Sequence, residues 1–398
     1  TSAKVRFNII DTPGHIDFTS EVKRSMRVLD GAVVVFDGVA GVEPQSETNW
    51  RYAEEAEVPR VCYINKLDRT GASFEKSYES ILDRLSTKAV RLQIPIGAED
   101  QFEGVIDVLE MKAFKFEGEM GKNVSAYEIP EAYQAEAKKY HDEIVERIVE
   151  TDDTMMTAFL EGTVPSLEEL KKQLRKAVCT NKIFPVLTGS SLKNKGVQRV
   201  LDAVVDYLPS PLDIPPVTGV DPRKAEDADP IQRSADDSEP FSGLAFKIMT
   251  DPFVGQLTFF RVYSGTLTSG SSVINSTKGK TERIGRLLKM HANKREEIKE
   301  VNAGDIAGAA AVMAEDLLNH AAIPEAHRGR TKPGCRHGIR RSKLSFLWVI
   351  DFGGVEESQL RKCLGSFGAR DVAQVRARFD FILRGGLHGE VGHVVSPE

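Results

Sequence analysis

The sequence has few cysteines, and their spacing suggests neither a metal site nor a disulfide framework. The four cysteines are Cys62, Cys179, Cys335 and Cys363, and no two of them form a C-x-x-C pair. This pattern argues against zinc binding and favours a reducing compartment, so we expect a cytoplasmic protein. No run of about 18 apolar residues is present and residues 1–10 lack the architecture of a signal peptide, so we expect no membrane contact.

An excess of positive charge is also missing. Lys and Arg total 53 against 59 Asp and Glu, which gives a net charge of −6. No overall basic field therefore attracts nucleic acid, and any RNA contact has to be a local patch. The length of 398 residues is sufficient for two or three domains with a core each.

Alternating strand and helix patterns predict a parallel α/β domain over residues 1–210. Apolar runs that are typical of buried strands occur at 5–10, 32–36, 61–64 and 183–187. A helical pattern follows the first run, and another covers 197–207 before Pro209. About residues 88–180 include two charged helical stretches and far exceed one βα connection. We expect an inserted α+β subdomain there.

The second half of the chain has a different texture. Residues 211–240 are rich in Pro, Asp and Ser, which predicts a surface linker. Short β-type runs separated by Ser-Gly turns over 241–313 predict a small β-barrel. The remaining residues, 314–398, predict an irregular tail.

The tail contains a basic stretch with two interpretations. Residues 320–343 carry ten Lys, Arg or His residues against the single acid Glu325, without helical or strand periodicity. The stretch is either a basic RNA-binding tail or, as we favour, a segment with no packed structure, disordered or wrongly translated.

Three short segments carry residues that fit a guanine-nucleotide site. They are Asp11-Thr12-Pro13-Gly14-His15, Asn65-Lys66-Leu67-Asp68 and Gly189-Ser190-Ser191-Leu192-Lys193. Each has a simpler interpretation when taken alone: the first and third as turns, and the second as a chance match to Asn-x-x-Asp. Their order along the chain, each after a predicted strand, makes coincidence improbable, because open α/β sheets bind ligands at the carboxyl ends of their strands.

The first segment predicts contacts with the phosphates. Asp11 ends a predicted strand, where its carboxylate can reach Mg²⁺ through a coordinated water. Gly14 has no Cβ, so its backbone N–H can approach a γ-phosphate. The imidazole of His15 can orient the attacking water, which makes it the candidate catalytic residue.

The other two segments predict contacts with the base. Asp68 can accept two hydrogen bonds from guanine that adenine does not offer in that pattern. Asn65 would contact the other edge of the base and hold neighbouring loops, and the stem of Lys66 would lie along the ring plane. Ser190 and Ser191 can receive the guanine oxygen.

One expected part of such a site is not found. Ten residues precede Asp11, and they contain no Gly-x-x-x-x-Gly-Lys-Ser/Thr loop to hold the triphosphate. We therefore expect a GTPase-type α/β domain that lacks its N-terminal P-loop segment, and with it most of the triphosphate affinity.

The chain resembles the bacterial translation elongation factor G family. The likeness covers about residues 3–312 and is carried by passages such as LDGAVVVFDGVAGVEPQSE at 29–47 and NKLDRTG at 65–71. It implies GTP or GDP with Mg²⁺ as ligands, with contacts from Asp11 to His15, Asn65 to Asp68 and Gly189 to Leu192. It also implies a cytoplasmic, monomeric GTPase that acts on the ribosome, where large-subunit RNA orders His15, and that moves tRNA and mRNA.

The resemblance stops at about Val312. Fainter likeness to the family's third domain at 360–381 and 386–390 suggests shifted reading frames, and the fourth and fifth domains of the family have no counterpart. Two functions stay open from the sequence: a partial elongation factor G that hydrolyses GTP, and a truncated relative that binds the ribosome without hydrolysis.

Overall fold

The computed structural model describes residues 5–12, 19–118, 121–219, 230–251, 255–276, 279–291, 294–310 and 344–352. The predictions for Pro13, Gly14 and His15, for the basic stretch at 320–343 and for the segments at 360–381 and 386–390 lie outside these residues.

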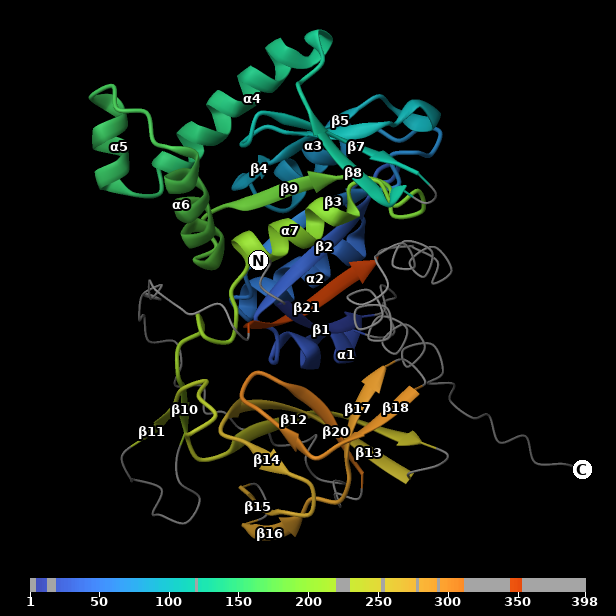
Figure 1. Ribbon diagram of the computed structural model, residues 1–398, viewed down its shortest axis with the longest axis vertical. Helices are drawn as coiled ribbons and strands as arrows, with labels where there is room; N and C mark the ends of the chain where they lie inside the picture. Colours follow the sequence, from blue (N-terminus) through green and yellow to red (C-terminus); the bar gives the residue numbers. More distant parts are fainter. Residues whose placement is uncertain are drawn as a thin grey trace, which may run out of the picture.

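A parallel sheet of six strands forms the centre of the first domain (Figure 1). In spatial order its strands are β1 (Val5–Thr12), β21 (Leu344–Phe352), β2 (Gly31–Asp37), β3 (Arg60–Asn65), β9 (Phe184–Thr188) and β4 (Ala89–Arg91). Every residue of β2 except Asp37 is buried, and so is every residue of β3 and β9. Such continuous apolar runs are typical of parallel strands that are covered on both faces. The strands predicted from the sequence are confirmed.

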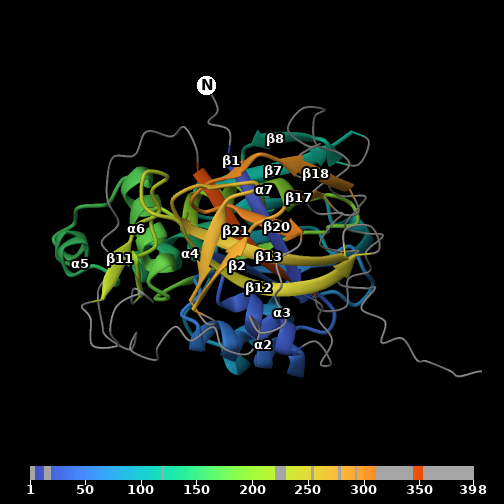
Figure 2. The same ribbon diagram turned by 90° about the horizontal axis from the view of Figure 1, so that it is seen from below.

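Helices cover both faces of this sheet. They are α1 (Thr19–Met26), α2 (Pro44–Glu55), α3 (Phe74–Arg84), α6 (Leu167–Cys179) and α7 (Val197–Tyr207). Figure 2 shows α2 and α3 on one side of the sheet, and α6 and α7 on the other. Local capping explains where two helices begin: the Ser73 hydroxyl accepts the N–H of Lys76 ahead of α3, and Ser166 and Glu169 form a capping box at α6.

A second, antiparallel sheet and two further helices are inserted between β4 and α6. The strands are β5 (Gln93–Ile96), β6 (Gly104–Asp107), β7 (Lys112–Glu117) and β8 (Asn123–Tyr127), with a short 3₁₀ turn at Glu99–Gln101, and the helices are α4 (Glu131–Val149) and α5 (Asp153–Leu160). Their apolar side chains continue the core of the parallel sheet. The segment therefore packs as an α+β unit against the main domain.

The second domain consists of short antiparallel strands. A five-stranded sheet contains β12 (Ser242–Asp251), β13 (Gly255–Ser264), β20 (Ile306–Ala310), β17 (Leu287–His291) and β18 (Lys294–Ile298). Two pairs complete the domain: β14 (Leu267–Thr268) with β19 (Glu300–Val301), and β15 (Ser272–Asn275) with β16 (Lys280–Arg283). The β-rich second domain agrees with the prediction.

The two domains share a hydrophobic core. Val22 and Met26 of α1 and Val28 after it pack in one buried cluster with Phe246 and Phe259 of the second domain. Polar contacts surround this cluster. Arg261 on β13 forms a 2.5 Å ion pair with Asp30 and donates to the Val28 carbonyl at 2.6 Å. Tyr263 donates to the Arg27 carbonyl at 3.2 Å. Lys247 on β12 forms an ion pair with Glu21 on α1. The second domain is therefore fastened to α1 and to the turn that follows it.

Two expectations about irregular structure need correction. The stretch at 211–240 contains an antiparallel pair, β10 (Val217–Gly219) with β11 (Ile231–Arg233), because two short runs of extended residues meet across the intervening chain. Residues 344–352 lie in the expected irregular tail but form β21, which pairs in parallel with both β1 and β2. Residues 346–350 of the run LSFLWVIDF are continuously apolar, which is typical of a central parallel strand.

Within the described residues, no helix has both the length and the apolar character needed to cross a bilayer. The two described cysteines, Cys62 and Cys179, are free.

Candidate functional site

The carboxyl ends of β2, β3 and β9 meet at one edge of the parallel sheet. Asp37 at the end of β2 lies opposite Asn65 at the end of β3, and Ile64 lies opposite Thr188 of β9. The second and third sequence motifs follow directly after two of these strands. The sheet therefore brings together Asn65 to Asp68 and Gly189 to Leu192, as the sequence predicted.

The side chain of Asn65 joins the two motifs. Its Oδ1 accepts the backbone N–H of Lys66 and the backbone N–H of Ser191, both at 2.8 Å. Backbone bonds run alongside, from Gly189 N–H to the Ile64 carbonyl at 3.0 Å and from Leu67 N–H to the Gly189 carbonyl at 3.3 Å. Asn65 is 1% exposed, so this link is shielded from water.

Two polar groups at this edge have no partner among the described residues. The Nδ2 of Asn65 is buried without a hydrogen bond. The half-buried carboxylate of Asp68 makes neither a hydrogen bond nor an ion pair with the described part of the chain. A buried donor without an acceptor is costly, and a ligand with matching groups removes that cost. A planar base that offers an acceptor to Asn65 and two N–H groups to Asp68 fits both.

The loop after β9 needs glycine at its first position. A Cβ added to Gly189 would lie 2.4 Å from the Lys195 carbonyl oxygen, closer than real Cβ contacts allow. Ser190 and Lys195 close this loop with two backbone hydrogen bonds of 2.8 and 2.9 Å. The Ser190 hydroxyl accepts the N–H of Lys193 at 3.2 Å, so this side chain serves the loop itself. Leu192 is half-buried beside it.

Lys66 is constrained at its backbone and at its side-chain ammonium. Its backbone has a φ of 63°, which is strained for a residue with a side chain. Its ammonium lies 2.7 Å from the Asp37 carboxylate, and the lysine side chain is 5% exposed. Asp37 was not singled out from the sequence. The available signal was its position, directly after an apolar run and before a glycine, at the edge where the other motifs meet.

The described part of the phosphate end consists of Asp11 and Thr12. Asp11 lies near the carboxyl end of β1, opposite Ile350 of β21, and Thr12 is 1% exposed with its hydroxyl unpaired among the described residues. Within the described residues, no group of three or more His, Cys, Asp or Glu side chains comes together to hold a metal.

Comparison with known proteins fits this geometry. Residues 1–210 match the family described as "Elongation factor Tu GTP binding domain", and residues 240–314 match "Elongation factor G domain 2". The chain belongs to the translational GTPase family. It is similar to a crystal structure of the protein ttk003000868 from Thermus thermophilus, with 26% identity and a TM-score of 0.62. The similarity covers 76% of this chain and 41% of that protein, so the chain spans less than half of that relative.

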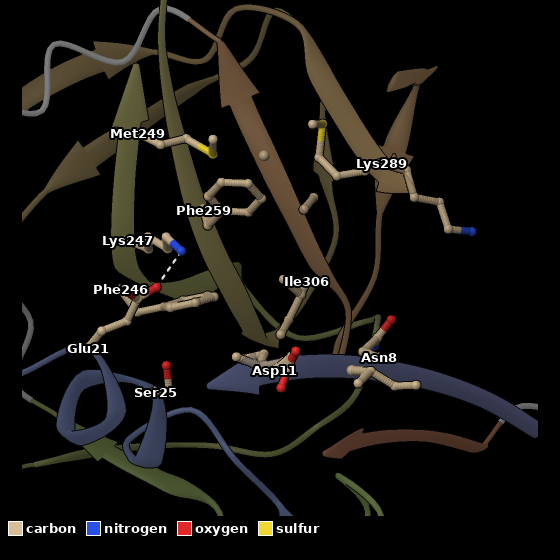
Figure 3. A pocket seen from close by; sticks show the side chains of 15 residues that line it. Asn8, Asp11, Glu21, Ser25, Phe246, Lys247, Met249, Phe259, Lys289 and Ile306 are labelled. Atoms are coloured by element: carbon tan, nitrogen blue, oxygen red, sulfur yellow. Dashed lines mark hydrogen bonds and ion pairs between the residues drawn. The ribbon is translucent and has the colours of Figure 1, made fainter. Parts of the chain in front are cut away.

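This translational GTPase also has a cavity at the interface of its two domains (Figure 3). The cavity has a volume of about 90 Å³. It lies between β1 and α1 on one side and β12, β13, β17 and β20 on the other, with Asp11 and Asn8 along its floor. Glu21 and Lys247, which form an ion pair, are part of the cavity wall. It lies apart from the Asn65 edge, so it does not provide the base-binding space.

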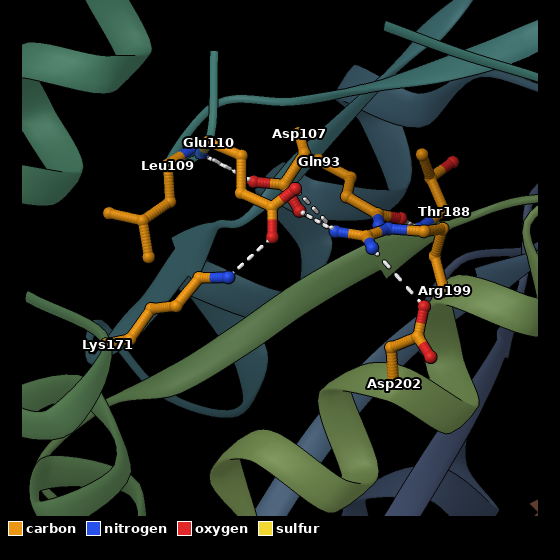
Figure 4. A network of polar contacts seen from close by, with 8 residues as sticks. All are labelled: Gln93, Asp107, Leu109, Glu110, Lys171, Thr188, Arg199 and Asp202. Atoms are coloured by element: carbon orange, nitrogen blue, oxygen red, sulfur yellow. Dashed lines mark hydrogen bonds and ion pairs between the residues drawn. The ribbon is translucent and has the colours of Figure 1, made fainter. Parts of the chain in front are cut away.

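A charged network joins α6 and α7 to the inserted sheet and to the turn after β6 (Figure 4). Arg199 on α7 contacts Asp107 of the inserted sheet at 2.9 Å, Glu110 at 3.2 Å and Asp202 at 3.2 Å. Lys171 on α6 pairs with Glu110 at 2.5 Å. Burial raises the pKa of the Asp107 carboxyl, although Arg199 acts in the opposite direction.

The same region connects to β9. The Thr188 N–H, one residue before Gly189, donates to the Gln93 side chain at 3.4 Å. The inserted subdomain therefore supports the strand that ends at the Gly189 loop. Arg199 and Gln93 could not be recognised from the sequence, because a charged residue within a helix and a polar residue in a short strand are ordinary surface features until their partners are known.

Proposed function

We propose that this chain is part of a translation factor of the elongation factor G type, which binds GTP and GDP and promotes movement of tRNA and mRNA on the ribosome. The observation that carries the nucleotide assignment is Asn65, whose Oδ1 ties together the two base-reading loops while its Nδ2 is buried without a partner among the described residues. The match of residues 240–314 to an elongation factor G domain favours this type among translational GTPases.

The base would be read by three groups. Asp68 accepts from the two N–H groups of guanine, the Nδ2 of Asn65 donates to the opposite edge, and the 189–192 loop supplies a donor for the guanine oxygen. The N–H of Ser191 is engaged with Asn65, whereas the N–H of Leu192 makes no hydrogen bond within the described residues. An adenine base presents an acceptor and an amine at the wrong positions, which leaves Asp68 unmatched.

The contacts with the phosphates are proposed from the sequence motif at Asp11 to His15. Asp11 would hold Mg²⁺ through water, the Gly14 N–H would contact the γ-phosphate, and His15 would orient the attacking water. Thr12 and Pro13 connect these residues. The bound Mg²⁺ would offset the negative charge of the phosphates. We expect large-subunit RNA to order His15, so hydrolysis should be slow without ribosomes, and we expect a cytoplasmic monomer.

The base assignment is tested with the full chain and GDP by titration calorimetry. Asp68→Asn should lower GDP affinity by roughly 100-fold, because an amide donates where guanine also donates. It should gain affinity for xanthosine diphosphate, whose C2 oxygen accepts from the new amide. Asp100→Asn, an acidic residue in the nearby 3₁₀ turn, is a control of equal charge change. Unchanged GDP binding in Asp68→Asn would refute the assignment.

A second candidate is a ribosome-binding relative that does not hydrolyse GTP. Phosphate release from GTP at saturating ribosomes separates the two. Stimulation that is lost in His15→Ala supports the enzyme, and binding to ribosomes without phosphate release supports the alternative.

A further inference from the structure

A buried ion pair lies at the edge where the guanine base would bind. The Nζ of Lys66 and the Oδ2 of Asp37 are 2.7 Å apart, and their side chains are 5% and 14% exposed. Burying a lysine costs free energy unless a carboxylate compensates its charge. The pair joins two neighbouring strands, because Asp37 lies opposite Asn65 in the parallel register.

Asp37 is fixed from more than one side. Its Oδ1 accepts the backbone N–H of Val39 at 2.8 Å and of Ala40 at 3.3 Å, so the carboxylate also closes the turn that follows β2. Burial by itself raises the pKa of Asp37, but the hydrogen bonds from Lys66 and Val39 outweigh burial and hold the pKa below its usual value. The carboxylate is therefore ionised at neutral pH and holds the lysine by charge as well as by hydrogen bonding.

The turn after β2 is braced on the base-reading loop. The Gly38 N–H donates to the Asn65 carbonyl at 2.8 Å, and the Ser73 N–H donates to the Gly38 carbonyl at 2.8 Å. A Cβ on Gly38 would come within 2.8 Å of that Asn65 oxygen, so the close approach of the two segments requires glycine. Asp37 thus belongs to a rigid platform rather than to a mobile surface loop.

Lys66 is ordered before any ligand arrives. Asn65 Oδ1 holds its backbone N–H at 2.8 Å, and Asp37 holds its ammonium, which fixes a side chain with four rotatable bonds. An immobilised side chain has already lost its conformational entropy, so the ligand does not lose that entropy on binding. Because its side chain is only 5% exposed, Lys66 is a fixed part of the base-reading loop at 65–68 and holds that loop in one arrangement.

We propose that Asp37 is a positioning residue of the nucleotide site, which sets guanine-nucleotide affinity by fixing Lys66 and, through it, the base-reading loop at 65–68. This inference rests on the proposed nucleotide-binding function. Asp37 acts through Lys66 and does not itself contact the nucleotide. Asp37 also links the turn at 38–41 to base binding, because its carboxylate accepts hydrogen bonds both from the backbone of that turn and from Lys66.

The test compares Asp37→Asn, Lys66→Met and the double variant in the full chain, with GDP affinity measured by calorimetry. Asparagine keeps the size of the side chain and an oxygen for the Val39 N–H but removes the charge. We expect about a tenfold loss of GDP affinity for Asp37→Asn, and no further loss when it is added to Lys66→Met. Glu47→Gln, which removes the partner of Arg84 on the neighbouring helices, should leave GDP affinity unchanged.

A second readout does not depend on nucleotide. Lys66 should react slowly with an amine-acetylating reagent, as followed by peptide mass spectrometry, and Asp37→Asn should raise that rate at least fivefold while Glu47→Gln does not. Equal loss of GDP affinity with and without Lys66, or an unchanged acetylation rate, would overturn the positioning role. If the parent chain binds no GDP, the proposed function fails. Faster acetylation in that case would leave Asp37 as an anchor of Lys66 alone, which overturns its role in nucleotide affinity.

Discussion

Breaking the ion pair between Asp30 and Arg261 should destabilise the junction of the two domains in a way that depends on which partner is removed. The pair spans the domains at 2.5 Å, and its side chains are 0% and 5% exposed. Removal of one partner leaves a buried charge uncompensated, which costs about 3–5 kcal/mol. The Oδ2 of Asp30 and the Nε of Arg261 have no hydrogen-bond partner among the described residues, so we expect the lower end, about 3 kcal/mol.

The two single variants should respond differently to pH. Burial raises the pKa of Asp30 to about 6 from 3.8, although Arg261 lowers it. The folded state therefore binds a proton more readily than the unfolded chain, and the stability contributed by this proton is full below pH 3.8 and lost as the pH rises through about 6. In Arg261→Leu, Asp30 loses the group that lowers its pKa. Arg261→Leu should therefore be nearly harmless at pH 5 and costly at pH 8.

Asp30→Asn removes the titrating carboxyl, so its own stability should be nearly the same at pH 5 and pH 8, because a guanidinium does not lose its proton in this range. The assay is urea unfolding at pH 5 and pH 8, followed by circular dichroism and by the fluorescence of the buried Trp50. The double variant Asp30→Asn with Arg261→Leu should be far more stable at pH 8 than the sum of the single losses indicates. Single losses that add within about 0.5 kcal/mol at pH 8, or an Arg261→Leu loss that is the same at pH 5 and pH 8, would refute this reasoning.

Three further predictions concern single positions. Gly189→Ala should weaken GDP binding about tenfold or more, measured by calorimetry, because the new Cβ would meet a backbone oxygen at 2.4 Å and displace the loop; wild-type affinity would contradict this. Arg199→Ala should lower the free energy of unfolding by about 3 kcal/mol in urea, since it leaves Asp107, 4% exposed, without its cation; Arg199→Lys should recover part of that loss. Ser166→Ala should cost about 1 kcal/mol by removing the capping box of α6, and a loss below about 0.3 kcal/mol would show that the cap is dispensable.

The regular elements of the first domain were predictable because local pattern determined them. A continuous apolar run such as Ala32 to Phe36, followed by turn residues, is typical of a central parallel strand buried on both faces, and the structure places it in β2. The base-reading residues were predictable for a related reason. Asn65 follows such a strand and Gly189 follows another, and parallel strands end at a common edge.

Features that depend on a distant partner were not predictable in this way. Asp37 is an ordinary turn residue in the sequence, and its role appears only when β3 brings Lys66 beside it. Arg261 lies in the middle of strand β13, and nothing in the neighbouring sequence indicates that its partner is Asp30 in the other domain. The strand at 344–352 was not predicted, because this run lies within the part of the chain that we expected to be an irregular tail. An apolar run also does not specify which strands it pairs with.

The position of β21 has a consequence for the order in which this protein can assemble. Val5 pairs with Leu344 and Gly31 pairs with Trp348, so one strand from late in the chain separates two strands from its beginning. While the chain is synthesised, β1 and β2 are made long before their shared neighbour, and their facing edges present unpaired backbone groups to solvent. Closing so large a loop adds a modest entropic cost but slows folding. This domain would therefore leave the ribosome ahead of β21 and reach its final form only after β21 has followed, and during that interval its open strands would need protection from other growing chains.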